Sequence, residues 1–494
     1  MASLDWVVLV VYLGGMAAVG MWAGRDQHDT DDFLLGGRSI PWWAALLSLV
    51  ATEISAATFL GAPEQGYIRD LSYLQFSIGT IAARFLLASV FIGAFYKAQV
   101  TTIYEFLRSR FGPGTNTITA GLFLFGRVFA DGSRLFIAAI TIEVVTGLSI
   151  AKAVLILAAV TILYTYAGGI KAVIYTDVAQ AVVLVGSGLT LLLTLWFGIE
   201  GSSGDIFQQL DQAQKFRLFN FDGSPLTNAY HVMTAVIGGF FLTMATHGTD
   251  HDMVQRLLTC KTDEGSRRSM WLSGFLGLMV TITFMGVGML LFIYLSQQPA
   301  DAPLALKAAE LREAGKNGHV LLFYALEILP SGVLGLVVAG VLAAAMSSLS
   351  SALNAMTATY INDFYRRHKP DLAPEAYLLA SRHATFVIGI LLAGFALLTA
   401  EYMKANPETD LLSLALGVMT FFYGGLLGIF LVALFSKVAG NDRTNLVAAI
   451  VSTLVVFTIA RTTSLAWPWF IVFGTVVSAT LSMLGRTPAE VLDR

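Results

Sequence analysis

The sequence predicts an all-α, polytopic membrane protein, and two observations lead to this fold class. Of its 494 residues, 56% are hydrophobic and 13% are charged, and the mean hydropathy is +0.71. The apolar residues gather in runs of about 20, each long enough to cross a hydrocarbon core of roughly 30 Å as a helix. Helices satisfy their own backbone polar groups inside lipid, so we expect residues 1–494 to form a single integral membrane domain.

We expect about thirteen membrane-spanning helices. The apolar runs lie at residues 5–24, 41–62, 71–96, 117–146, 149–167, 176–198, 229–249, 269–296, 331–360, 379–400, 411–436, 443–461 and 466–485. An odd number of spans places the two termini on opposite sides of the membrane. The longest connections, 199–228 and 297–318, are then expected on the same side as the N-terminus.

The distribution of positive charge predicts the orientation. With the N-terminus outside and the C-terminus in the cytoplasm, the cytoplasmic connections contain most of the Lys and Arg residues, as the positive-inside rule requires. The residues that favour this orientation include Lys97, Arg108, Arg110, Arg256, Lys261, Arg267, Arg268, Arg366, Arg367 and Lys369.

Composition argues against several other classes of protein. A net charge of −3 does not suit a nucleic-acid partner, which needs a basic surface. Cys260 is the only cysteine, so we expect neither a disulfide framework nor a thiolate metal cluster. The first apolar run lacks a basic leader and ends at Arg25 without a small-residue cleavage motif, so we expect a retained helix.

Four hydroxyl groups lie within five residues of one apolar span, in the sequence Ser-Ser-Leu-Ser-Ser at 347–351. At 100° per residue, three of these serines and Ala344 share an arc of about 100° on the helix. One interpretation is a close-packing stripe whose hydroxyls bond back to the preceding turn. The other is a site for a hard monovalent cation such as Na⁺, which neutral oxygens suit. The spacing alone leaves both open.

A polar break interrupts the second span. Residues 51–56, with the sequence Ala-Thr-Glu-Ile-Ser-Ala, place Thr52, Glu53 and Ser55 at mid-depth. We expect the helix to unwind there and to release backbone carbonyls. If this helix touches the serine-rich helix, those carbonyls complete a cation site.

Other spans contain ionisable residues, each of which is a functional hypothesis inside a membrane. Arg127, Asp131 and Arg134 lie at i, i+4 and i+7 on one face, and Asp177 opens the sixth span. Segment 246–251 contains two histidines at i and i+4, but it lacks the Glu of a metalloprotease helix and a third ligand, so we do not expect a zinc site.

At this point the sequence resembles the solute:sodium symporter family over nearly the whole chain. The matching segments are 31–43, 48–61, 102–106, 166–180, 248–256 and the serine-rich span ending at Asn354. The resemblance implies a leucine-transporter-type fold of two inverted five-helix repeats. It places the repeats at 41–200 and 229–436, after an extra helix and loop at 1–40 and before two further helices at 437–494.

The resemblance also implies two sodium sites. In the first, Na⁺ binds the carbonyls and hydroxyls of Ala51, Ile54, Ala344, Ser347 and Ser348. In the second, found in some members, the matching ligands are Asp177, Ser347, Ser350 and Ser351. We therefore expect two Na⁺ per solute, although Asp177 also fits a plain capping role near a helix N-terminus.

For the solute, the family's binding region maps onto Glu53, Ser55, Thr58, Gln75, Thr80, Arg127 and Asp250. Arg127 is the nearest match to an arginine that grips the substrate carboxylate in sialic acid transporters of this family, and a guanidinium suits such a group. The alternative is that Arg127 and Arg134 both clamp Asp131. Tyr423 is a candidate gate, next to glycines that permit close helix packing.

The expected function is import of a small organic solute, coupled to Na⁺, by alternating access. A carboxylate-bearing anion such as sialic acid or a monocarboxylate is favoured, and a sugar or an amino acid is the alternative. The resemblance implies a non-enzymatic, monomeric protein of the plasma membrane, the inner membrane in bacteria, with Na⁺, the solute and the bilayer as partners. A proton-coupled transporter, a channel or a transport-like sensor remain the alternatives from other classes.

Overall fold

The computed structural model describes residues 1–25, 34–165 and 169–487. Within these ranges the chain is helical, with isolated β-bridges and no strands, so the predicted all-α class is confirmed. The first residues of the 31–43 and 166–180 segments lie outside the described residues.

Among the described residues, the first half of the chain forms ten α-helices. They are α1 (Ser3–Ala23), α3 (Trp42–Glu53), α4 (Ala56–Ile68), α5 (Gln75–Leu86), α6 (Ile92–Ala98), α7 (Ile103–Phe111), α8 (Pro113–Thr146), α9 (Ile150–Thr165), α10 (Ile170–Gly198) and α11 (Ser203–Gln212). Short 3₁₀ segments lie at Gly36–Arg38 and Leu71–Leu74, and a π segment at Leu87–Phe91 joins α5 to α6.

The second half begins with α12 (Val232–Gly248). It continues with α13 (His251–Leu258), α14 (Asp263–Ser296), α15 (Pro303–Glu313), α16 (Val320–Ile328), α17 (Val333–Thr359), α18 (Arg366–His368), α19 (Pro374–Ala405), α20 (Leu411–Phe435), α21 (Asp442–Thr462) and α22 (Pro468–Met483). A 3₁₀ turn at Asn317–His319 precedes α16, and a π segment at Tyr360–Tyr365 extends α17.

The helices are long and apolar enough for a multi-span membrane protein. Among the described residues, 8 helices could cross a membrane, or up to 11 spans if each bent pair is counted once. Taking α8 and α9 as separate spans and adding the shorter α22 gives the thirteen that the sequence predicts. That number stays a prediction.

Two of the bent pairs are broken spans at the positions where polar residues interrupt the apolar runs. The axes of α3 and α4 differ by 62°, and those of α12 and α13 by 58°. At the first break Ile54 has non-helical torsions and Ser55 is extended. The predicted unwinding near 51–56 is therefore confirmed. The second break lies at the end of the predicted 229–249 run, and the helical path continues as α13 to Leu258.

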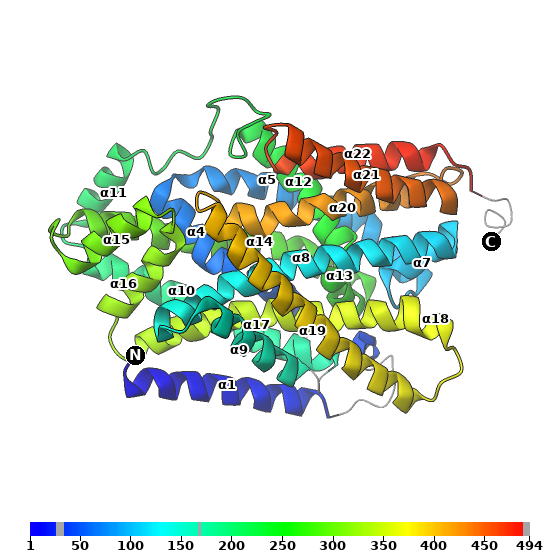
Figure 1. Ribbon diagram of the computed structural model, residues 1–494, viewed down its shortest axis with the longest axis horizontal. Coiled ribbons are helices and arrows are strands. Elements are labelled where there is room, and N and C mark those ends of the chain that lie inside the picture. The colour runs from blue at the N-terminus through cyan, green and yellow to red at the C-terminus, as the bar shows by residue number, and fades with distance from the viewer. Residues whose placement is uncertain (26–33, 166–168, 488–494) are drawn as a thin grey trace.

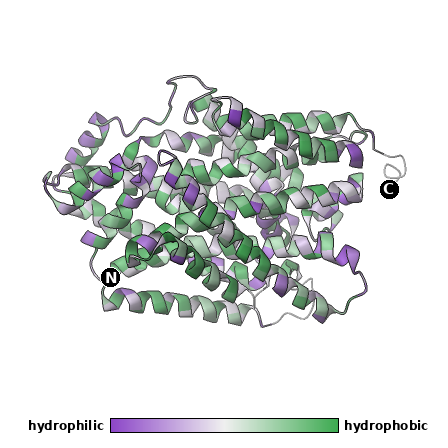
Figure 2. Cartoon of the chain, in the orientation of Figure 1, coloured by the Kyte–Doolittle hydropathy of each residue, from purple (hydrophilic) through white to green (hydrophobic). Residues whose placement is uncertain are grey.

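The bundle is arranged around α17, which packs against α10, α8, α3 and α1. The stretch of α17 that is long enough to cross the membrane is 89% buried, which is the largest buried share among the candidate spans. Figure 1 shows the N-terminus at the end of the bundle that also holds α11, α15 and α16, while α22 ends at the other end. In Figure 2 hydrophobic residues cover most of the helical middle, and hydrophilic ones are frequent around α11, α15 and α18. Orientation in the membrane and the repeat boundaries stay predictions.

Candidate functional site

The hydroxyl of Ser348 joins the serine-rich helix to the broken helix. It donates to the Thr52 carbonyl at 3.0 Å and to the Ala344 carbonyl, one turn back on α17, at 3.1 Å. Ser348 is fully buried. The serine-rich helix α17 and the broken helix α3 therefore touch, as the predicted cation site requires.

The break releases carbonyls toward this contact. The Ser55 N–H donates to the Glu53 carbonyl at 3.1 Å, and the Thr58 N–H donates to the Ser55 carbonyl at 2.9 Å. These bonds leave the carbonyls of Ala51 and Ile54 outside the helical ladder. Neutral carbonyl and hydroxyl oxygens around an unwound helix are the donor set that a sodium ion favours. The residues of the predicted first site therefore fit Na⁺ by chemistry, and their role as ligands stays a prediction.

A second group of oxygens surrounds the carboxylate of Asp177 on α10. The hydroxyls of Ser347 and Ser48 each donate to it at 2.6 Å, one to each carboxylate oxygen. The hydroxyl of Thr52 lies 3.4 Å from the same carboxylate and 3.3 Å from the hydroxyl of Ser351. Helices α3, α10 and α17 thus meet at one buried, oxygen-rich point.

Ser350 is the member of the predicted second site that lies apart. Its hydroxyl donates to the Ser347 carbonyl at 3.2 Å, as the packing interpretation of the serine run expects. The structure therefore brings Asp177, Ser347 and Ser351 into one cluster through Thr52, and gives the Ser350 hydroxyl a backbone partner.

Arg256 reaches into this cluster from α13. Its Nε donates to the Ser48 hydroxyl at 2.9 Å, and its Nη2 donates to Ser351 and lies 3.4 Å from Asp177. The side chain is fully buried. The prediction that Arg256 belongs to a cytoplasmic connection is therefore wrong, because polar residues end the apolar run at 249 although the broken span continues through α13.

Arg127 on α8 lies at the centre of a second charged cluster. Its Nε lies 2.9 Å from Asp131, its Nη1 3.2 Å from Asp250, and its Nη2 pairs with Asp252. Arg134 contacts the other oxygen of Asp131 at 3.2 Å. The clamp on Asp131 is therefore present, and all three nitrogens of Arg127 have carboxylate partners.

The two clusters share one carboxylate. One oxygen of Asp252 binds Arg127, and the other accepts from Arg256 Nη1 at 2.8 Å. Asp252 is fully buried at the start of α13. A continuous chain of charged side chains therefore runs from the predicted solute region to the predicted second sodium site.

The predicted gate touches a predicted solute residue. The Tyr423 hydroxyl on α20 donates to Asp250 at 2.7 Å, and Asp250 also caps α13 by accepting from the Asp252 N–H at 2.9 Å. The neighbouring Gly424 allows α20 to approach α22, since a Cβ there would lie 2.9 Å from the Ile471 carbonyl oxygen. The predicted packing role of that glycine fits this contact.

Glu53 belongs to a separate buried cluster between α3, α5, α12 and α14. Arg84, which is not among the predicted site residues, pairs with Glu53 and donates to Ser273 at 2.8 Å. Arg84 also lies 3.0 Å from the ring of His247. The Glu53 side chain is 28% exposed, which makes it the accessible member of this group.

The remaining predicted solute residues are spread along α4 and α5. The Gln75 amide donates to the Ser72 and Tyr230 carbonyls at 2.6 and 3.1 Å, so it anchors the loop that precedes α12. Thr80 donates to the backbone of its own helix at 3.0 Å. Ser55 is buried at the break and Thr58 is half-buried one turn later.

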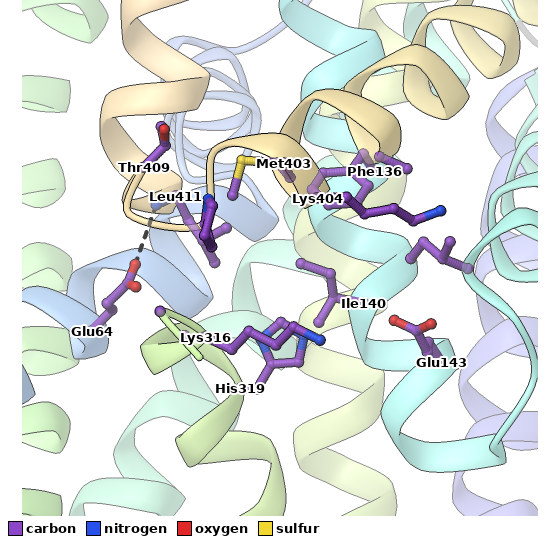
Figure 3. Close-up of a pocket in the computed structure, with 15 residues that line it drawn as sticks. Glu64, Phe136, Ile140, Glu143, Lys316, His319, Met403, Lys404, Thr409 and Leu411 are labelled. Atoms are coloured by element: carbon purple, nitrogen blue, oxygen red, sulfur yellow. Dashed lines mark hydrogen bonds between the residues drawn. The ribbon is translucent and has the colours of Figure 1, made fainter. Parts of the chain in front are cut away.

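A cavity that the sequence did not predict opens near the end of the bundle that holds α15 and α16. It has a volume of about 150 Å³. Figure 3 shows Lys316 and His319 between Glu64 and Glu143 in this view, with Glu64 accepting from the Leu411 N–H at 3.2 Å. Burial, helped by the charge of Lys316, lowers the pKa of His319 to about 4.

The comparison with protein families decides the assignment. The model of the sodium:solute symporter family matches residues 33–455. The chain belongs to this family. The sequence-based resemblance is therefore confirmed.

Curated symporters are similar over most of their length. The sodium/sialic acid symporter NanT of Aliivibrio fischeri is 29% identical over 96% of this chain and 91% of its own. The sodium/sialic acid symporter SiaT of Proteus mirabilis is 27% identical over 99% of this chain and 97% of its own. A sodium/glucose cotransporter of Vibrio parahaemolyticus is 27% identical over 88% of this chain and 81% of its own.

Solved transporters share the fold. A Na⁺-coupled sialic acid symporter in a substrate-bound, outward-open state superimposes with a TM-score of 0.86 and 24% identity, over 98% of this chain and 97% of the other. Mhp1, a nucleobase-cation-symport-1 family transporter, has a TM-score of 0.55 and 15% identity, over 92% and 93% of the two chains. The leucine-transporter-type fold expected for this symporter is therefore confirmed.

In the two clusters that Asp252 links, four residues were not named as site residues from the sequence. They are Ser48, Thr52, Asp252 and Arg256. All four lie inside segments that the symporter shares with its family, 48–61 and 248–256, so the signal was present. Their partners come from other helices, and spacing along one helix does not reveal them.

Proposed function

We propose that this symporter couples Na⁺ entry to the import of a small carboxylate-bearing organic solute by alternating access. One observation carries the proposal: the Ser348 hydroxyl joins the unwound part of α3 to α17, beside carbonyls that the break releases. A cation bound among these oxygens holds the two helices together. It therefore favours the conformation in which they touch.

Coupling follows if that conformation also binds the solute more tightly. Differential affinity of this kind is reciprocal, so Na⁺ raises the affinity for the solute and the solute raises the affinity for Na⁺. The membrane potential adds about 2.3 kcal/mol per charge per 100 mV, which supports accumulation without any covalent chemistry. We therefore infer transport and no enzymatic activity, with the chain acting as a monomer in the plasma membrane.

A carboxylate on the solute is supported by Arg127 and by the two sialic acid symporters among the similar proteins. Because the three nitrogens of Arg127 already face Asp131, Asp250 and Asp252, a solute carboxylate binds there by exchanging with one of them. Asp250 is the candidate for exchange, since Tyr423 and the Asp252 N–H still satisfy it afterwards. Tyr423 then acts as the gate.

Two Na⁺ per solute is supported by the charge of the linked clusters. Three arginines, Arg127, Arg134 and Arg256, face four carboxylates, Asp131, Asp177, Asp250 and Asp252. With every group ionised this network carries one net negative charge, and an anionic solute adds another. Two sodium ions neutralise both, which matters because isolated buried charge is costly.

Purified protein in liposomes tests the proposal. Uptake of labelled sialic acids, monocarboxylates, amino acids and sugars is measured with an inward Na⁺ gradient and with choline in its place. We expect saturable, Na⁺-dependent uptake of a carboxylate solute. Uptake that follows a pH gradient in choline would contradict sodium coupling, and Na⁺-dependent uptake of an uncharged sugar alone would contradict the carboxylate.

A further inference from the structure

The guanidinium of Arg256 lies among the same oxygens that are predicted to bind the second sodium ion. Its Nη2 donates to the Ser351 hydroxyl and lies 3.4 Å from Asp177. Its Nε donates to Ser48 at 2.9 Å, and Ser48 in turn donates to Asp177 at 2.6 Å. All four side chains are buried.

A sodium ion and this guanidinium cannot use that oxygen set together. The Ser351 oxygen that accepts from Nη2 is the oxygen that Na⁺ would bind, and both cations need the charge of Asp177. Two like charges within a few ångströms in a buried site also repel strongly. The two cations are therefore alternative partners of Asp177 and Ser351.

We propose that Arg256 is a built-in competitor for the second sodium ion, so that Na⁺ binds at Asp177 only when Arg256 swings away. This inference rests on the proposed sodium-coupled function and adds a regulating residue to it. Arg256 acts as a positioning residue that sets the sodium affinity of the second site.

Asp252 gives the displaced arginine a partner. The Asp252 carboxylate accepts from Arg256 Nη1 at 2.8 Å, and the Asp252 carbonyl accepts from the same nitrogen. The guanidinium therefore keeps an ion pair on its own helix when it leaves Asp177. No charge is stranded in the interior by the exchange.

The Asp252 carboxylate also connects this change of partners at Arg256 to the predicted solute region. Asp252 binds Arg127 through its other oxygen. When Arg256 loses Asp177, it draws more strongly on Asp252, and the bond from Asp252 to Arg127 weakens. Arg127 is then less neutralised by its carboxylate partners, which favours the exchange of Asp250 for a solute carboxylate, so sodium at the second site favours solute binding.

Sodium titrations of the full-length protein in detergent test the competition. The midpoint of thermal unfolding is followed as NaCl replaces choline chloride at constant ionic strength, because a ligand of the folded state raises it. Arg256→Gln is expected to lower the Na⁺ concentration for half-maximal stabilisation by about tenfold or more. The double variant Arg256→Gln/Asp177→Asn is expected to lose this gain.

Ser48→Ala is the second variant, and it tests the competition between Arg256 and Na⁺ if Arg256→Gln does not fold. Ser48 is not among the predicted sodium ligands, yet it accepts from Arg256 Nε, so its loss is expected to lower the same Na⁺ concentration by a few fold. Arg110→Gln is the matched control. Arg110 donates to the carbonyls of Ser436 and Lys437, which do not belong to the cluster around Asp177. It is expected to leave the Na⁺ dependence unchanged.

The outcomes separate the inference from the proposed function. A wild-type protein that Na⁺ does not stabilise would contradict sodium binding altogether. A wild-type protein that Na⁺ stabilises, with variants at Arg256 or Ser48 whose Na⁺ dependence is unchanged or weaker, would overturn the competition alone.

Discussion

Ser347 donates its hydroxyl to the Asp177 carboxylate over 2.6 Å, and this bond joins α17 to α10. Because Ser347 belongs to both predicted sodium sites, Ser347→Ala is expected to weaken Na⁺ activation of uptake by about tenfold or more. The measurement is the Na⁺ concentration that gives half-maximal uptake. Thr357→Ala removes a different buried hydroxyl of α17, bonded to Thr385 at 3.0 Å, and serves as the control.

Asp177→Asn tests the number of sodium ions. The amide is neutral and has one acceptor oxygen fewer, so the second ion loses its only charged ligand. We expect the Hill coefficient for Na⁺ to fall from near two toward one, while transport driven by the first site persists. A wild-type coefficient of one, or an unchanged coefficient in the variant, would argue against a second site.

Ser348→Ala tests the first site by itself. The hydroxyl bonds to carbonyls of Thr52 and Ala344, so its loss removes a predicted ligand and the link between α3 and α17. Uptake is expected to need severalfold more Na⁺. If the variant's uptake depends on Na⁺ as the wild type's does, Ser348 has only a packing role.

The features of this site that lie on a single helix could be predicted from the sequence. The break near 51–56 and the serine run could be predicted because polar residues in an apolar span need partners. The chain from Asp177 through Arg256 and Asp252 to Arg127 could not, since three helices supply it. Arg256 was misplaced for the same reason: hydropathy ended the span where the broken helix becomes polar, although α13 continues into the interior.

The contact of Tyr423 with Asp250 predicts an effect on solute affinity. Tyr423→Phe removes the donor 2.7 Å from the carboxylate, and a hydrogen bond to a charged group contributes about 1.5–3 kcal/mol. Asp250 is then expected to hold Arg127 more tightly and to yield it less readily to the solute. We expect the KM for solute to rise about tenfold with the Hill coefficient for Na⁺ unchanged. Tyr324→Phe, at a buried tyrosine packed on Tyr294, is the control.

The cavity at His319 predicts a pH-dependent stability. Because burial lowers the pKa of His319 from 6.5 to about 4, the unfolded chain binds a proton before the folded one does as the pH falls. Stability is therefore lost as the pH falls from 6.5 toward 4, and the loss at pH 5 is about 1 kcal/mol after allowing for partial exposure. His319→Gln removes this titration, so its unfolding midpoint is expected to fall less than that of the wild type between pH 7.5 and pH 5. Equal falls in the two proteins would show that protonation of His319 costs the folded state nothing.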